Sequence, residues 1–326
     1  MSIIKTGKTC EAVRAGIIFK KMIKNSLKFI LSVVVYVVAF MVASPFMPYS
    51  KGFMEYNELI LEEHPIALLA QLVNFVWICF TIYFIIRHTP YAGIKLFARM
   101  LYVLFFTMYF ITFLGAMYSV DAFGGSITSL DFLFVMFTGL FALLPTTLLM
   151  IKFFGNKDEA TTIIENKKLD IKTVAVILGI SGLVYFVVYF IFAYSVQWQF
   201  EAFRNFYSDT QWGRAAWGGE YSGLFPWLSI TALRGILNGL FVLPLLSMIT
   251  KNKRTFMIGL CLIYVAPAIN HVAPNPMFPD TVRLLHLVAM SGSMLSFGLI
   301  VGNILWRKTK SITNYELKIT NHKLIR

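Results

Sequence analysis

Apolar residues occur along the chain in eight long runs, each about as long as a helix that spans a bilayer. About twenty residues at a rise of about 1.5 Å cross a hydrocarbon core of about 30 Å. The runs lack the short alternating segments of a membrane β-barrel, so they predict helices. The predicted spans are 27–48, 66–86, 97–118, 131–154, 172–196, 225–249, 255–272 and 283–306.

The composition excludes an ordinary water-soluble fold. Of the 326 residues, 58% are hydrophobic and only 14% are charged, whereas about a quarter of the residues of a soluble domain are charged. We therefore expect an all-α, polytopic transmembrane helical bundle over residues 27–306. A basic N-terminal segment (1–26) precedes it and a basic tail (307–326) follows it.

The connections between the runs alternate in their content of Lys and Arg. The N-terminal stretch from Lys5 to Lys28, the tail from Arg307 and the connections at 87–99, 152–172 and 251–254 together hold 24 of the 29 basic residues. Short cationic loops stay in the cytoplasm, so both termini are predicted to be cytoplasmic and the first run is typical of a signal anchor. The net charge of +13 then follows from membrane topology, and no nucleic-acid partner is expected.

Two polar residues interrupt the sixth run. Arg234 lies well inside the run, and Asn238 follows it by one helical turn. A charge at such a depth costs at least about 2.5 kcal/mol when it has neither a partner nor water. Arg234 is thus expected to face a polar cavity or an acidic side chain. Snorkelling towards the headgroups is the alternative.

Polar residues also gather where the seventh run gives way to the eighth. His271, Asp280, Arg283 and His286 occur there, and Arg283 and His286 are three residues apart, so they are expected to share a helix face. Together with Arg234 they predict a ligand site for phosphate or carboxylate, which guanidinium groups bind well. In the alternative, Asp280 caps the eighth helix, Arg283 anchors at the interface and His286 is a buried core residue.

Motifs that would indicate catalysis or a metal are missing from the sequence. It has no HExxH, no paired CxxC and no GxSxG. Cys79 and Cys261 fall within apolar runs, so no disulfide is predicted. We expect no cofactor and no metal site, and we assign no catalytic residue.

Two further patterns concern packing and the loop that is predicted to face outwards. Gly235 and Gly239, and likewise Gly298 and Gly302, form GxxxG pairs that predict close helix contacts. The segment 197–224 is rich in aromatic residues, which suits a cap at the membrane interface. A platform for a lipid or a partner protein is the alternative.

Two stretches carry a resemblance to known proteins. YFIFAYSVQWQFEAFRNFY (189–207) and PNPMFPDTVRLLH (274–286) are similar to pieces of uncharacterised multi-pass membrane proteins of bacteria. The resemblance covers roughly the C-terminal half of the chain and implies a bacterial inner-membrane setting. It implies no activity, ligand or catalytic residue.

Three hypotheses for the function follow from these patterns. In the first, a polar cavity lined by Arg234, Asn238, Arg283 and His286 binds or passes a small anionic ligand or a lipid headgroup. In the second, the chain is a membrane-embedded enzyme for a lipid-linked substrate, with His271 or His286 as general base. In the third, it is an accessory subunit that docks a membrane protein partner. Membrane lipids are expected partners in all three.

Overall fold

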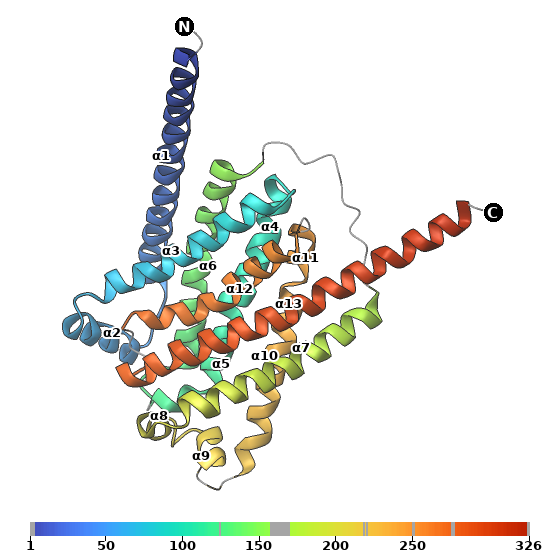
Figure 1. Ribbon diagram of the computed structural model, residues 1–326. Coiled ribbons are helices and arrows are strands. Elements are labelled where there is room, and N and C mark those ends of the chain that lie inside the picture. Colours follow the sequence, from blue (N-terminus) through green and yellow to red (C-terminus); the bar gives the residue numbers. More distant parts are fainter. Residues whose placement is uncertain are drawn as a thin grey trace.

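The structure is a computed structural model, and it describes residues 4–123, 125–156, 170–217, 219, 221–249, 252–274 and 278–324. Within these ranges the regular structure is helical and no strand occurs (Figure 1). Among the described residues, eight helices are long and apolar enough to cross a membrane, which agrees with the predicted count and is the architecture of a multi-pass membrane protein. They cover Ile18–Phe46, Leu69–His88, Gly93–Tyr118, Ser129–Phe154, Ile171–Gln197, Phe225–Met248, Lys253–Val272 and Asp280–Lys308.

Several spans combine more than one helical element. The first joins α1 (Ile4–Ala43) and the 3-10 helix η1 (Ser44–Phe46), and the second and fourth are α3 (Ala67–His88) and α6 (Ser129–Phe154). The third joins α4 (Gly93–Leu104), the π-helical η2 (Phe105–Phe110) and α5 (Ile111–Tyr118), and the fifth joins α7 (Ile171–Phe192) and the π-helical η4 (Ala193–Gln197). The last three are α10 (Leu224–Phe241) with α11 (Leu243–Met248), α12 (Lys253–Ile269) and α13 (Asp280–Leu324).

Some predicted segments fall partly outside the described residues. These are residues 1–3 of the basic segment, 157–169 of the connection after the fourth span, 218 and 220 of the aromatic segment, 251 of the connection 251–254, and 325–326 of the tail. From Ile4 onwards the basic segment is part of α1, which runs without a break into the first span (Figure 1).

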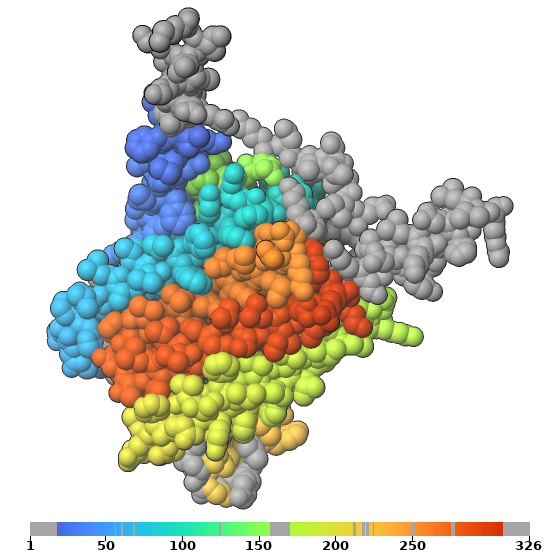
Figure 2. Space-filling view, in the orientation of Figure 1, coloured from blue at the N-terminus to red at the C-terminus, as the bar shows by residue number. Residues whose placement is uncertain are grey.

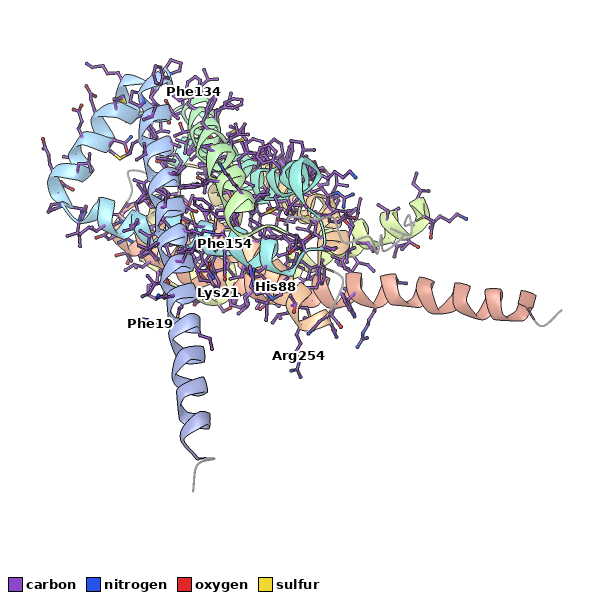
Figure 3. All side chains as sticks on the ribbon, turned by 90° about the horizontal axis from the view of Figure 1, so that it is seen from above. Phe19, Lys21, His88, Phe134, Phe154 and Arg254 are labelled. Atoms are coloured by element: carbon purple, nitrogen blue, oxygen red, sulfur yellow. The ribbon has the colours of Figure 1, made fainter. Side chains whose placement is uncertain are left out.

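The two ends of the bundle differ in charge. The acidic end holds the short helices α2 (Lys51–Glu63), α8 (Glu201–Phe206) and α9 (Gln211–Trp217). Its acidic residues include Glu55, Glu58, Glu62, Glu63, Glu201 and Asp209. At the opposite, basic end lie Lys21, His88 and Arg254, each near the end of a span. Figure 3 shows these three residues on the side towards which α1 projects, and Phe134 on the opposite side.

Neighbouring spans pack closely through glycine. Figure 2 shows α3, α12, α13 and α7 as adjacent bands across one face, in agreement with the contacts between these helices. A Cβ atom on Gly235 of α10 would lie 2.8 Å from the carbonyl oxygen of Ser181 in α7. One on Gly298 of α13 would lie 3.2 Å from Cys261 Sγ in α12. Both GxxxG pairs therefore mark helix contacts, and this packing interpretation is confirmed.

Large apolar side chains also cover the outer surface of the spans. Val34, Leu69, Leu183 and Leu299 are all exposed. In water such a surface would favour association, but it matches the hydrocarbon that surrounds a membrane protein.

Asp131 connects two segments at the acidic end. This fully buried residue in the first turn of α6 accepts hydrogen bonds from the backbone N–H of Ser50 and of Thr128, both at 2.7 Å. The hydroxyls of Ser50 and Thr128 also donate to it, both at 2.8 Å. The resulting capping box holds the start of α6 against the segment that precedes α2.

Candidate functional site

A cavity of about 180 Å³ lies among the helices near the acidic end of the bundle. Its walls come from α5, α6, α7, α10, α13 and the short helices that connect them. Among the described residues that line it, none is Asp, Glu or Lys. The polar side chains that matter most for its chemistry are Tyr185, Tyr189, Tyr207, Arg234, His271 and His286.

Arg234 supplies the positive charge of this cavity. It projects from α10 towards α5, where its guanidinium carbon lies 2.8 Å from the position that a Cβ on Gly115 would take. A Cβ at position 115 would therefore displace the guanidinium from its present place. The Tyr185 ring centre lies 5.7 Å from the same carbon, a distance at which a cation is attracted to an aromatic face.

The positive charge of Arg234 has no acidic partner among the described residues. Its Nε atom is buried without a hydrogen bond, and within the described ranges no carboxylate pairs with the guanidinium. A buried charge without a partner is costly, and a cavity that contains one attracts anions. Asn238 does not line this cavity. Its amide Nδ2 donates to the carbonyl of Arg234 at 2.9 Å and so bonds within α10.

His286 is held on both sides of its ring. The amide Nε2 of Gln197 donates to Nδ1 at 2.9 Å, and the hydroxyl of Tyr207 lies 2.9 Å from Nε2. With Nδ1 as acceptor, the proton resides on Nε2, which donates to the Tyr207 oxygen. Burial raises the pKa of the Tyr207 phenol well above its ordinary value, so this group stays neutral. The arrangement therefore favours a neutral imidazole in a fixed orientation.

The π-helical segment η4 brings Gln197 to this histidine. Gln197 is the last residue of η4, and its side chain is almost fully buried. A π-helical turn contains an extra residue and so rotates the part of the helix beyond it, which is why such turns often occur at functional sites.

His271 lies beside His286 in the cavity wall. The two rings are nearly parallel, 21° apart, with centres separated by 5.3 Å. Nδ1 of His271 is buried and has no hydrogen-bond partner. The cavity thus holds one imidazole whose nitrogens are both engaged and one that has an unused buried nitrogen.

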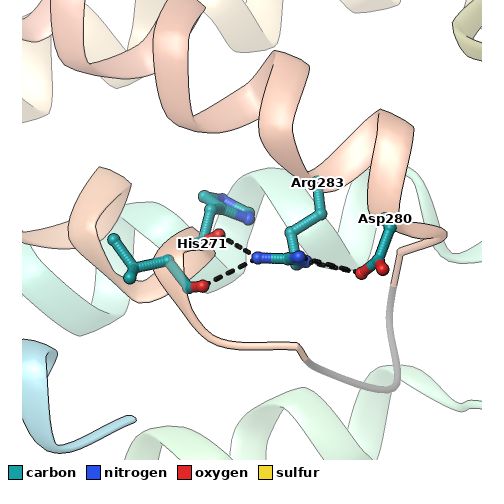
Figure 4. A network of polar contacts seen from close by, with 4 residues as sticks. His271, Asp280 and Arg283 are labelled. Atoms are coloured by element: carbon teal, nitrogen blue, oxygen red, sulfur yellow. Dashed lines mark hydrogen bonds and ion pairs between the residues drawn. The ribbon is translucent and has the colours of Figure 1, made fainter. Parts of the chain in front are cut away.

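Arg283 has a different role from Arg234. Its Nη1 donates to the carbonyl oxygens of His271 and Val272, both at 2.8 Å, and its Nη2 lies 2.8 Å from Asp280 Oδ1 (Figure 4). Neither Arg283 nor Asp280 lines the cavity. Arg283 and His286 therefore have different partners, although they are only three residues apart. The Arg283 network fixes the turn that presents His271.

The structure brings together part of the expected site. Arg234, His271 and His286 line one cavity, whereas Asn238, Asp280 and Arg283 bond to other groups. The tyrosines and Gln197 were not among the expected residues. Tyr185 and Tyr189 are four residues apart and so share a helix face, a spacing that would have indicated a polar stripe within an apolar run.

The arrangement offers hydrogen bonds and one charge rather than an acid–base pair. Within the part of the chain that the structure describes, no group of three or more His, Cys, Asp or Glu side chains is placed to hold a metal ion. Neither histidine of the cavity has a carboxylate within hydrogen-bond distance among these residues. The geometry is suited to binding an anion.

Comparisons with known proteins add no family to this description. No protein-family model, curated protein or solved structure matches the chain.

Proposed function

We propose that this protein binds an anionic group, such as the phosphate or carboxylate of a small molecule or of a lipid headgroup, in the cavity at Arg234. The observation that carries the proposal is a guanidinium without a carboxylate partner, in a cavity whose other described polar residues are neutral. Ionisable groups within membrane helices are expensive and are retained mainly where they serve a site or a pathway.

The neighbouring groups support recognition of an anion. A guanidinium offers several N–H donors in one plane, which suits the oxygens of phosphate and carboxylate. The Tyr185 hydroxyl and His271 Nδ1 lie at the same cavity and are buried without partners, so a ligand that bonds to them would remove the cost of leaving them unpaired.

The distribution of charge supports an orientation for this site. Lys and Arg predominate at the end that carries both termini, so these termini are cytoplasmic in our proposal, and the cavity lies towards the opposite face of a bacterial inner membrane. The ligand would then approach from the outer leaflet or from the space beyond it.

Binding or passage is favoured over the enzyme hypothesis. A general base next to a lipid-linked substrate is expected to have a carboxylate that orients it, and the described lining of the cavity contains none. Docking of a membrane protein partner on the aromatic segment 197–224 is a separate hypothesis. Anion binding in the cavity does not depend on it.

The proposal is tested by titrating the purified protein in lipid nanodiscs with inorganic phosphate, acetate and butyl phosphate. We expect Arg234→Gln to weaken binding of the best of these anions by at least about tenfold, because a hydrogen bond to a charged group contributes about 1.5–3 kcal/mol. Lys51→Gln is the matched control, since it removes an exposed cation from the same end of the bundle.

Stability distinguishes a binding role from a structural one. An arginine without a described partner stabilises the fold little, so Arg234→Gln is expected to keep the unfolding temperature of the protein without ligand. Equal anion affinity in Arg234→Gln and the wild type, or a large loss of stability with no change in affinity, would contradict the proposal.

A further inference from the structure

A second cavity of about 400 Å³ lies directly beside the first. Thr112, Phe113, Val135, Pro267 and Asn270 line both. The same side chains therefore border both spaces, and the two cavities adjoin at these residues.

The second cavity has the chemistry of a site for hydrocarbon. Its surface is mostly apolar, and the described residues that line it include no Lys, Arg, Asp or Glu. Apolar side chains from α1, α2, α3 and η2 contribute, among them Phe40, Phe53, Met54, Phe75, Ile78 and Met108. A charged ligand has no partner here, whereas an alkyl chain finds apolar surface on several sides.

One residue of the lining that both cavities share, Asn270, belongs to a polar cluster. Asn270 Oδ1 accepts hydrogen bonds from Gln71 Nε2 at 3.0 Å and from Asn74 Nδ2 at 3.2 Å. Asn74 is 8% exposed, and its Oδ1 atom is buried without a partner. Asn270 thus faces both cavities, and the carboxamides of Gln71 and Asn74, which line only the second cavity, donate to it.

We infer that the two cavities bind one amphiphile, whose anionic head lies at Arg234 and whose alkyl chain lies in the second cavity. The inference rests on the proposed function, and it names the ligand class as a lipid-like molecule rather than a free small anion. The order of the three environments carries it: a cation, then Asn270 in the shared lining, then the apolar walls. An anionic lipid has its charged head, its polar linkage and its chain in the same order.

The test uses a series of n-alkyl phosphates from butyl to dodecyl, with inorganic phosphate as the free anion. Ala266 lines only the second cavity and is 2% exposed, so Ala266→Phe fills that space and leaves Arg234 in place. Ser44→Phe fills the same cavity from the end of the first span and serves as a second variant in case the first fails to fold. Ile258→Phe, on the exposed face of α12, is the matched control.

We expect dodecyl phosphate to bind the wild type and Ile258→Phe more tightly than butyl phosphate by at least about tenfold, because each buried methylene contributes to affinity. In a filled variant that remains monodisperse this gain should fall below about threefold, while the affinity for inorganic phosphate stays unchanged. Partition of the probes into the nanodisc lipid is the same for every variant, so the comparison between variants reports on the cavity.

The outcomes separate this inference from the proposal beneath it. Phosphate binding that depends on Arg234, together with an equal chain-length gain in the filled variants and the wild type, would overturn the amphiphile and leave a small-anion site. Loss of the dependence on Arg234 for every probe would overturn the proposed function itself.

Discussion

Two arginines near the acidic end of the bundle show how the surroundings of a residue decide its role. Arg283 donates to two backbone carbonyls and to Asp280, so its charge and its donors are used within the fold. Arg234 has no such partner among the described residues. Arg234 is therefore the arginine that our proposal assigns to a ligand, although the sequence analysis predicted both arginines at the same site.

Replacing Arg283 with Ala is expected to destabilise the protein by about 2–4 kcal/mol, because the carbonyls of His271 and Val272 would lose their buried donor. The unfolding free energy in an SDS titration measures this loss. Asp280→Ala is the comparison, with an expected cost below about 1 kcal/mol, since the Asp280 side chain is 56% exposed. Equal losses in the two variants would show that the ion pair, and not the carbonyl contacts, stabilises the turn.

Tyr207 is expected to make stability depend on alkaline pH. Burial raises the pKa of this phenol well above the ordinary value of 10.0, so the unfolded chain loses the proton first and stability falls as the pH rises above that value. Tyr207→Phe should make the slope of unfolding free energy against pH less steep by about 1.4 kcal/mol per pH unit.

The roles of single residues were harder to predict than their positions. Arg234, His271 and His286 were singled out because polar residues in apolar runs are conspicuous. Whether they meet depends on contacts between α10, α13 and the short helix η6 (Asn270–Val272), and spacing along the chain carries no information about such contacts. Gln197 and the tyrosines were missed because they occur in strongly aromatic segments, where they resemble interface residues. The ligand-binding role of the six expected residues stays a prediction.

Among the helices, the pair α7 and α10 shows how closely two spans approach. A Cβ atom on Gly182 of α7 would lie 3.2 Å from the carbonyl oxygen of Ala232 in α10, and Gly235 of α10 lies against Ser181 of α7. This contact positions Tyr185 and Arg234 on the same side of the interface, next to the cavity. The close packing is therefore a condition for the geometry of the site.

Gly235→Ala is expected to destabilise the protein by about 1–3 kcal/mol, because the new methyl group would meet backbone atoms of α7 that cannot move aside easily. Gly179→Ala is a control on α7 itself, since nothing lies within 4 Å of its Cβ position. That substitution should be neutral or slightly stabilising. Similar losses in the two variants, measured by thermal unfolding, would argue against tight packing at Gly235.

The helices themselves follow from local information. Each predicted run coincides with a helix, because the length of an apolar run and the need to satisfy the backbone in hydrocarbon leave few alternatives. The π-helical segments η2 and η4 were not predicted, since a single extra residue does not change hydropathy. The helix α1 begins before its predicted run and α13 ends after its own. A helix can extend past the apolar run because its backbone hydrogen bonds form in polar segments as well.

For the whole molecule, the asymmetry of charge predicts an orientation that labelling can check. In a background with Cys10, Cys79 and Cys261 replaced by Ala, Ser208→Cys lies at an exposed position between α8 and α9, and Lys172→Cys lies at the exposed start of α7. An impermeant maleimide should label Ser208→Cys in intact cells and Lys172→Cys only after lysis. The reverse pattern would mean that the protein is inserted the other way round.

The π-helical turn η4 has an evolutionary consequence. Such a turn arises when one residue is inserted into an α-helix, and each added residue rotates the remainder of the helix by about 100°. Before such an insertion, the residue now at position 197 would have pointed elsewhere and His286 would have lacked its amide partner. A single codon is therefore enough to create or erase this part of the cavity.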